Sequence, residues 1–465
     1  MSRGMQPGEM SRRGQHLGGV LVLYLAISTP LFAGPLTVSS DGPITSIAKA
    51  IAMAKPGAVI EVHGGIYREN VLLDRSIQLV GIGRPVIQGT GQASVVTITA
   101  DRCVVRGFVI EHSGGMLVNE DSGILVKSSD NRIENNELRD VLFGIYLLHA
   151  DRNEIVGNTI VGRSYLDIGD RGSGIHIWNS SYIMLERNLI SEARDGVYLQ
   201  NAYHSQVREN RVHHLRYGLH YMFSDDNDLE GNEFSDDVAG AAIMYSKRIR
   251  LRRNAFLHNR GFASYGVLFQ SDQNCRIEDN IIADNAVGIF MEALLDSEVT
   301  GNLVAGNDVA FKVFSSATGN RFEKNNIVEN LSPLELVGRQ TENAWNGPVS
   351  GNYWSDYEGF DLDGDGVGDL PYRIQNIFEH MEAEMPLLRL YLFSPAAQSL
   401  AMAERGFPLF QEQHEADKHP LMKPVAIASM RSHVRVRPAI SLLSIIVPTL
   451  LLVFATTVFR MGTRP

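Results

Sequence analysis

The sequence has little positive charge. Its 42 lysines and arginines are outnumbered by 53 aspartates and glutamates, which gives a formal net charge of −11 over 465 residues. A chain with this balance repels polyanions, so we expect no nucleic-acid partner. Charged residues make up only 20% of the chain and apolar residues 44%, which leaves ample material for a hydrophobic core.

The central part of the chain also lacks the apolar spacing of helices. Instead, a pattern of apolar residue, two variable residues, Asn or Gly, one variable residue and apolar residue recurs, most often every 22 residues, with anchors at Gly107, Asn136, Asn158, Asn188, Asn210, Asn232, Asn254, Asn280, Asn302 and Asn325. A second mark, usually Gly-apolar-x-apolar, follows each anchor except Asn325, at Gly123, Gly144, Gly174, Gly196, Gly218, Gly240, Gly266, Gly288 and Ala310.

This repeat predicts an all-β fold, a right-handed parallel β-helix of about nine coils with three short strands each. We assign residues 35–385 to it and expect alternate residues to face inward, with turn asparagines bonded along the stack. An amphipathic helix over residues 44–54 is expected to cap the first coil, because an open solenoid end exposes apolar edges. The alternative, a β-propeller or β-sandwich, would show longer periods or less regular asparagines.

Cysteine is scarce, with only Cys103 and Cys275. On the repeat assignment they lie about seven coils apart, and coils repeat every ~4.8 Å, so they are roughly 30 Å apart. That distance excludes an intrachain disulfide. We expect both to be small packing residues or free thiols.

Two long apolar runs flank the repeats. Residues 1–34 are typical of a secretory signal peptide, with arginines ahead of an apolar run and small residues at its exit. Residues 439–459 contain no charge and are long enough for a transmembrane helix. We therefore expect a periplasmic protein anchored to the inner membrane by a C-terminal helix, with an apolar, helical segment and linker over residues 386–438.

Three insertions leave the repeats at one corner, between Gly107 and Gly123, Asn158 and Gly174, and Asn254 and Gly266. Insertions on one edge usually border a binding face; tolerated surface drift is the alternative. The adjoining strands should bury positions one and three after each marked Gly. Their outward positions are unusually apolar and aromatic for a wet surface, namely Tyr146, Leu148, His176, Trp178, Tyr198, Gln200, His220, Met222, Ala242, Met244, Leu268, Gln270, Phe290 and Glu292.

Within this face, His220 and Met222 should stand two residues apart on one strand, with Met244 one coil away in the same column. An imidazole and two thioethers suit a soft ion such as Cu(I), with His176, His213 and His214 as further candidate ligands. A pair of methionines on a merely adhesive face is the alternative.

The outward face has almost none of the carboxylates that a polysaccharide lyase, epimerase or other glycan-active β-helix would need. The nearest acidic residues, Asp225, Asp226, Asp228, Asp236 and Asp237, are expected in turns, where Asp commonly bonds its own backbone. We therefore expect no enzyme, with a polysaccharide-active protein as the alternative.

Near the end of the repeats, a loop resembles the first part of a calcium loop, with Asp361, Asp363, Asp365, the Val367 carbonyl and Asp369 at its ligand positions. Position 12 is Tyr372, so no bidentate glutamate closes it. A structural Ca²⁺ and a metal-free Gly/Asp turn both remain open.

Taken in order, the capping segment, the Asn/Gly coils, the block Gly351-Asn-Tyr-Trp-Ser-Asp-Tyr357, the Asp/Gly loop with Leu370-Pro371-Tyr372 and the apolar stretch 386–410 resemble the NosD family. The resemblance covers roughly residues 36–410. It implies a non-enzymatic protein that works with an ABC transporter permease and ATPase and a copper chaperone to mature the copper centres of nitrous-oxide reductase. It also implies that residues 385–410 dock on the transporter. The apolar run 439–459 departs from the family pattern.

Overall fold

The computed structural model describes residues 35–338, 341–374 and 415–427, together with residues 387, 391, 394–396 and 399. The expected signal peptide, the expected transmembrane helix and most of the segment 386–438 lie outside these residues. None of the helices in the described part of the chain is long and apolar enough to cross a membrane.

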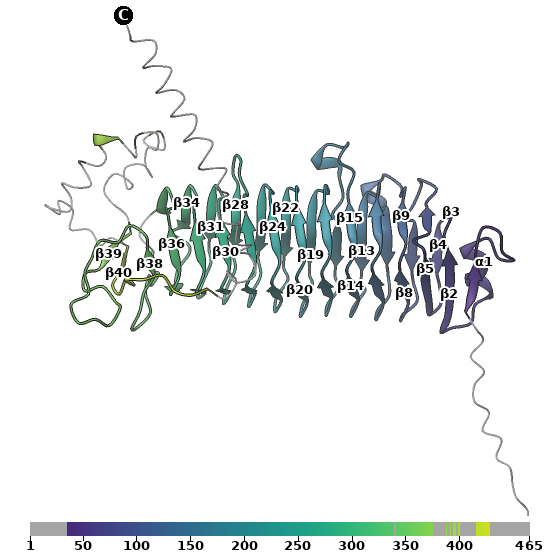
Figure 1. Cartoon of the computed structure of the whole chain (residues 1–465), viewed down its shortest axis with the longest axis horizontal. Helices are drawn as coiled ribbons and strands as arrows, with labels where there is room; N and C mark the ends of the chain where they lie inside the picture. Colours follow the sequence, from purple (N-terminus) through teal and green to yellow (C-terminus); the bar gives the residue numbers. More distant parts are fainter. Residues whose placement is uncertain are drawn as a thin grey trace, which may run out of the picture. The chain divides into compact units, whose positions relative to one another are not determined.

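The chain winds through three parallel sheets in turn, so that each coil adds one strand to each sheet (Figure 1). Sheet A has 13 strands: β1 (Leu36–Val38), β2 (Ala58–His63), β5 (Ile77–Ile82), β8 (Val104–Arg106), β11 (Arg132–Glu134), β14 (Glu154–Val156), β17 (Met184–Glu186), β20 (Gln206–Arg208), β23 (Asp228–Glu230), β26 (Arg250–Arg252), β29 (Arg276–Glu278), β32 (Glu298–Thr300) and β35 (Arg321–Glu323). Sheet B has 13 strands: β3 (Ile66–Arg68), β6 (Val86–Gln88), β9 (Val109–Glu111), β12 (Glu137–Arg139), β15 (Thr159–Val161), β18 (Leu189–Ser191), β21 (Arg211–His213), β24 (Glu233–Ser235), β27 (Ala255–Leu257), β30 (Ile281–Ala283), β33 (Leu303–Ala305), β36 (Asn326–Val328) and β38 (Tyr353–Trp354). Sheet C has 12 strands: β4 (Val71–Leu73), β7 (Val96–Ile98), β10 (Ser122–Val126), β13 (Phe143–Leu148), β16 (Ile175–Trp178), β19 (Asp195–Gln200), β22 (Tyr217–Met222), β25 (Ala239–Met244), β28 (Tyr265–Gln270), β31 (Val287–Glu292), β34 (Val309–Phe314) and β37 (Ser332–Val337).

The stack is longer than the nine coils expected from the sequence, since sheets A and B each hold 13 strands. The early strands were missed because their coils lack the asparagine mark. The first anchor was also misplaced: the N–H of Phe108, rather than that of Gly107, donates to the side chain of Asn136 at 3.1 Å. The parallel solenoid itself is confirmed.

The turn asparagines form the expected ladder along the stack. Its members are Asn136, Asn158, Asn188, Asn210, Asn232, Asn254, Asn280, Asn302, Asn325 and Asn352, all buried. At Asn210, the backbone N–H and the side-chain Nδ2 both donate to Oδ1 of Asn232, at 3.0 and 2.9 Å, and Nδ2 also donates to the Leu185 carbonyl. Each coil is thus bonded to both neighbours through a satisfied buried amide.

The core fills the inside of the coils. The residues one and three positions after each marked glycine in sheet C are fully buried, as expected, among them Ile145, Leu147, Val197, Leu199 and Leu219. The two cysteines are buried and free. They precede β8 and β29 of sheet A, which are seven strands apart, so the absence of an intrachain disulfide is confirmed.

A short helix lies against the first coils. Helix α1 (Ile47–Met53) contacts β1, β2 and β4, and it buries Ile47, Ala50 and Ile51. Its first N–H groups are bonded by the carboxylate of Glu69, which accepts from Ile47 and Ala48 at 2.8 and 3.0 Å. These donors would otherwise lack partners.

The last coil is covered by a segment from farther along the chain. Strand β39 (Tyr372–Arg373) pairs antiparallel with β40 (Ala416–Asp417), and the N–H of Val425 donates to Oδ1 of Asn326. The sequence analysis, which placed an apolar, helical segment and linker at residues 386–438, did not anticipate that residues 420–427 pack on the end of the solenoid.

Candidate functional site

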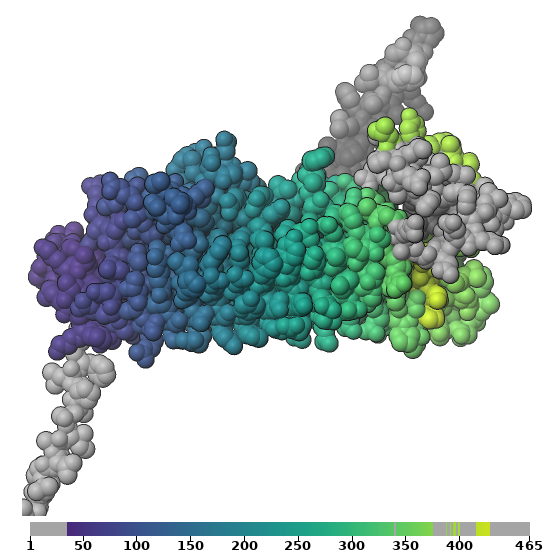
Figure 2. Space-filling model, turned by 180° about the vertical axis from the view of Figure 1, so that it is seen from behind, coloured from purple at the N-terminus to yellow at the C-terminus, as the bar shows by residue number. Residues whose placement is uncertain are grey.

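The three insertions emerge at the same corner, as expected. Loop 1 (residues 112–121), loop 2 (residues 162–174) and loop 3 (residues 258–264) each join a strand of sheet B to the next strand of sheet C. Loop 1 contains the short 3-10 helix η1 (Leu117–Asn119), and loop 2 contains η2 (Ile168–Asp170). In Figure 2, the blue-teal and green loops rise above the edge of the stack. The insertions therefore border the outward face of sheet C.

Loops 1 and 2 are fastened to each other. The guanidinium of Arg163 in loop 2 donates to the carbonyls of Ser113 and Gly114 in loop 1, at 2.7 and 3.2 Å. The Tyr146 hydroxyl donates to Glu120 of loop 1 at 3.0 Å, and Leu166 of loop 2 packs on the cluster around Tyr146. The loops thus cover the first part of the outward face.

Four rings stand in one outward column, and the first of them lies under this cover. We call it the aromatic–histidine column; its members are Tyr146, His176, Tyr198 and His220. The ring centroids of His176 lie 4.4 Å from those of both Tyr146 and Tyr198, nearly parallel to each. Tyr198 meets His220 edge to face at 4.7 Å. All four point away from the core, yet all four are buried.

His176 is enclosed within this column. Its Nε2 is buried with no hydrogen-bond partner among the described residues. Burial lowers the pKa of His176 to about 3, so the ring is neutral at physiological pH and serves as a stacking member between two tyrosines. Tyr198 separates it from His220.

His220 differs from His176 because it has a charged partner. Its Nδ1 lies 3.3 Å from Oδ2 of Asp195 on the neighbouring strand β19. Asp195 is fully buried, and Arg216 donates to both of its oxygens, at 2.9 and 2.8 Å. Burial would raise the pKa of Asp195, but the hydrogen bonds from His220 and Arg216 outweigh burial and hold the pKa below its usual value.

Sequence reasoning missed Asp195 and Arg216. A signal was present: in the position before the marked glycine, the coils carry Ser122, Phe143, Ser173, Asp195, Tyr217, Ala239, Tyr265, Val287 and Val309. Asp195 is the one charged residue in that column. Its partner Arg216 lies one coil farther, so the pair emerges only once the register is known.

The two methionines lie where the sequence predicts. Met222 and Met244 are paired in register on β22 and β25, and His220 pairs with Ala242 in the same two strands. Neighbouring strands are ~4.8 Å apart and alternate residues along a strand ~7 Å. The imidazole and two thioethers therefore share one patch of the outward face, and the methionines are only partly buried.

The other histidines lie elsewhere. His213 ends β21 in sheet B and His214 follows it, and their Nδ1 atoms are 2.7 Å apart. They belong to the corner between sheets B and C, while Met222 and Met244 end strands of sheet C. The structure does not bring them together with the methionines.

The acidic residues of the glycan alternative are dispersed. Asp225 and Asp226 both pair with Arg248. Asp237 is buried in the turn that follows the sheet B strand β24. Asp228 begins β23 instead of lying in a turn. Asp226 and Asp228 line a hollow on sheet A, and Asp236 and Asp237 line a separate one at the corner between sheets B and C.

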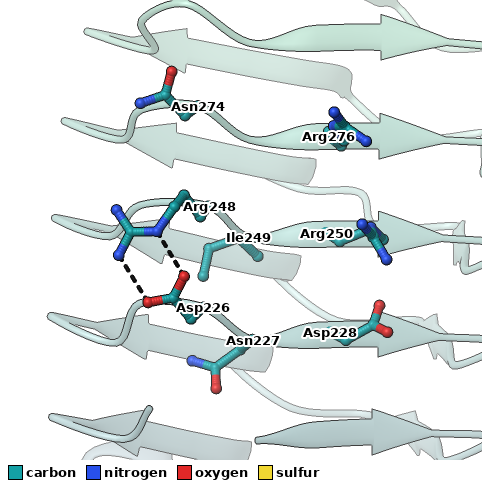
Figure 3. Close-up of a pocket in the computed structure, with 8 residues that line it drawn as sticks. All are labelled: Asp226, Asn227, Asp228, Arg248, Ile249, Arg250, Asn274 and Arg276. Atoms are coloured by element: carbon teal, nitrogen blue, oxygen red, sulfur yellow. Dashed lines mark hydrogen bonds and ion pairs between the residues drawn. The ribbon is translucent and has the colours of Figure 1, made fainter. Parts of the chain in front are cut away.

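A hollow of about 470 Å³ lies on sheet A, away from His220. Figure 3 shows Arg248 bonded to Asp226 at its rim, with Arg250 and Arg276 on successive strands beside it. This hollow is lined by side chains of mixed charge. It shares no lining residue with the His220 patch.

The expected calcium loop brings its first acids together. Oxygens of Asp361, Asp363 and Asp365 lie within 4.8 Å of one another, and no other group of three His, Cys, Asp or Glu side chains in the described residues does so. The Asp361 carboxylate accepts the N–H groups of Gly364 and Gly366, and Asp369 accepts that of Leu362. The carboxylates of the loop therefore bond N–H groups of the same loop. Calcium binding stays a prediction.

The Asn-Tyr-Trp-Ser-Asp-Tyr block forms the end of the solenoid. Trp354 is buried and stacks on Tyr372 with centroids 4.6 Å apart, and the Tyr372 hydroxyl donates to Asp356. Tyr357 donates to the Leu370 carbonyl at 2.6 Å. The motifs that carry the family resemblance are thus packed against each other.

Comparison with known proteins shows which proteins this chain resembles. Residues 162–359, which include His220, Met222 and Met244, match the family described as periplasmic copper-binding protein (NosD), and residues 70–206 match one of unknown function. A Stutzerimonas stutzeri protein named as a probable ABC transporter binding protein NosD is 28% identical over 77% of this chain and 85% of its own. A Pseudomonas aeruginosa protein of the same name is 29% identical over 89% of this chain and 97% of its own.

The chain is similar to NosD proteins along most of its length. The resemblance stated from its motifs is thereby confirmed. Among solved structures, the A-module of the mannuronan C-5 epimerase AlgE4 from Azotobacter vinelandii has 15% sequence identity and a TM-score of 0.45, covering 66% of this chain and 93% of its own. The catalytic unit of a Streptomyces thermodiastaticus α-1,3-glucanase has 16% identity and a TM-score of 0.47, covering 70% of each.

Proposed function

We propose that this NosD relative is a periplasmic accessory protein for the maturation of nitrous-oxide reductase and that it holds Cu(I) on the outward face of sheet C. The observation that carries the proposal is the register of β22 and β25. Met222 lies on β22 together with His220, and it pairs with Met244 on β25. Thioether sulfur and imidazole nitrogen are ligands that Cu(I) prefers.

The surroundings of this patch support transfer better than permanent storage. The thioethers of Met222 and Met244 are soft, neutral and only partly buried, so a copper ion held by them would remain accessible to a partner. The three insertion loops project from the neighbouring corner and present apolar side chains, including Val118, Tyr165 and Phe262. A partner could contact these loops while reaching the patch.

The proposed partners of this chain are inferred from the names of its relatives. Their names associate them with an ABC transporter, and we propose that this chain works with a transporter permease and ATPase, a copper chaperone and nitrous-oxide reductase. It performs no catalysis in this proposal. Residues 385–410 would dock on the transporter, with the segments 1–34 and 439–459 directing export and anchoring in the inner membrane.

The copper proposal is tested by measuring Cu(I) affinity by competition with a chromophoric chelator. We expect alanine replacement of His220, Met222 and Met244 together to lower the affinity at least tenfold. The matched control replaces His63 and Met184, which lie on strands of sheet A, and should leave it unchanged. Equal affinity of the triple variant and the unaltered protein would remove these three residues from the site.

The glycan alternative is tested on the same protein. Turnover of a uronate polymer that is abolished by replacing Asp225 and Asp226 would favour a lyase or epimerase over the copper carrier. No turnover, together with the copper result above, supports the accessory role.

A further inference from the structure

We infer that Asp195, itself held by Arg216, is a positioning residue that fixes the ring and the tautomer of His220, so that Nδ1 carries the proton and the Nε2 lone pair is free for a ligand. The inference rests on the proposed function in taking that ligand to be Cu(I).

The contact with Asp195 determines which ring nitrogen of His220 carries a proton. Asp195 is fully buried, and its two carboxylate oxygens accept from Arg216 at 2.9 and 2.8 Å. A carboxylate has no proton to donate, so the contact of 3.3 Å between Oδ2 and Nδ1 of His220 requires the proton to be on Nδ1. In the neutral ring, the other nitrogen, Nε2, is then unprotonated.

The rings on either side hold the imidazole in place. Tyr198 and Tyr217 both meet His220 edge to face, with centroids 4.7 and 5.0 Å away. The guanidinium of Arg216 lies over the Tyr217 ring at 4.5 Å, which fixes the arginine that orients Asp195. In the described structure no protein group bonds Nε2 of His220. This nitrogen is therefore the one left for a ligand.

Such an arrangement is what a metal-binding histidine needs. A carboxylate on the second ring nitrogen fixes the tautomer and makes the free nitrogen a stronger ligand, and loss of such a partner typically lowers metal affinity 10–100-fold. His176, in the same column, has Ser173 rather than a carboxylate beside its Nδ1 among the described residues, with 3.4 Å between Nδ1 and Oγ. The difference singles out His220 as the presented ligand.

The test uses the full-length protein labelled with ¹⁵N-histidine, and His220 is identified by its loss in the His220→Gln variant. Two-bond proton–nitrogen NMR should show His220 protonated on Nδ1 alone. Asp195→Ala should convert it to a mixture with Nε2 protonated and lower Cu(I) affinity about 10–100-fold. Alanine suits this column because Ala239 occupies it two coils away.

A second variant avoids leaving the half-buried Arg216 without its charged partner, which can destabilise the fold. Asp195→Ala combined with Arg216→Gln removes both charges and should give the same tautomer mixture. The matched control is Asp284→Asn, because Asp284 contacts Nδ1 of the exposed His258 at 2.7 Å. It should alter neither the His220 signals nor the copper affinity.

The outcomes separate the inference from the proposed function. An unchanged His220 tautomer in the folded double variant would overturn the positioning role, whatever the copper affinity. A changed tautomer in a protein that binds no Cu(I) would support the positioning role and overturn copper as the ligand. A changed tautomer with weaker Cu(I) binding supports both.

Discussion

The carboxylate of Asp417 accepts the backbone N–H of Asn352 at 2.7 Å, which is the place the next asparagine of the ladder would take. The same oxygen accepts from Nδ2 of Asn352 and from the indole of Trp354, at 3.3 and 3.0 Å. Asp417 is fully buried. An acid 65 residues farther along the chain thus satisfies the open end of the ladder, much as Glu69 satisfies the first turn of α1 at the other end.

Replacement of Asp417 by Ala should therefore loosen the last coil. The N–H groups of Asn352 and Trp354 would lose their acceptor, at a cost of about 2–4 kcal/mol. Hydrogen exchange measured by mass spectrometry should show faster exchange in residues 345–357 with little change around Asn210. Lys418→Ala, an exposed neighbour, should change neither region, and uniform loss of protection along the whole solenoid would contradict a local capping role.

The features that repeat within each coil could be predicted from the sequence. Asparagine at the turn, glycine at the corner and apolar residues at alternate positions each act on the nearest coil, so a local pattern carries them. The corner of the insertions followed from the same register. For this reason Met222 and Met244 were placed correctly beside each other.

Contacts that occur once could not be predicted in this way. Asp195 meets Arg216 and His220 in a single place, and Asp417 returns to Asn352 across 65 residues. Burial of the outward rings also escaped prediction, because alternation says which way Tyr146 points but not that loops 1 and 2 cover it. One-off contacts leave no period in a sequence.

The thiols of Cys103 and Cys275 should be inert in the folded protein. Both are about 1% exposed, and burial raises the pKa of Cys275 to about 12, so no thiolate is available. Labelling with a maleimide should proceed only as fast as unfolding. A cysteine introduced at the exposed Ser315 is the positive control, and rapid labelling of the unaltered protein would contradict the buried positions.

Tyr221 carries a hydroxyl that the fold does not use. The side chain is fully buried, and its oxygen has no hydrogen-bond partner in the described part of the chain. Tyr221→Phe keeps the ring and removes the unpaired group, so it should raise the free energy of unfolding by about 1–2 kcal/mol. Urea denaturation followed by tryptophan fluorescence measures this, with the exposed Tyr182→Phe as control; a less stable Tyr221→Phe protein would refute the prediction.

Asp237 occupies an asparagine position in a second ladder. Its Oδ1 accepts from the Leu215 N–H at 2.8 Å and its own N–H donates to Asn259, while Oδ2 has no partner in the described structure. In the following coils, Nδ2 of Asn259 donates to Asn285, and Nδ2 of Asn285 to Asn307. Asp237 has no such donor when ionised, and burial raises its pKa well above the usual value.

Asp237→Asn should therefore stabilise the protein, and the gain should depend on pH. Because the folded pKa is raised, the acid destabilises the fold increasingly as pH rises above the unfolded value of about 3.9 towards the folded pKa. The variant removes this penalty and supplies the missing donor, so we expect a gain of about 1–3 kcal/mol at pH 7 that shrinks as pH falls towards 4. Urea denaturation across this range measures it, with the exposed Asp236→Asn as control; a gain independent of pH would show that Asp237 is not buried as a neutral acid.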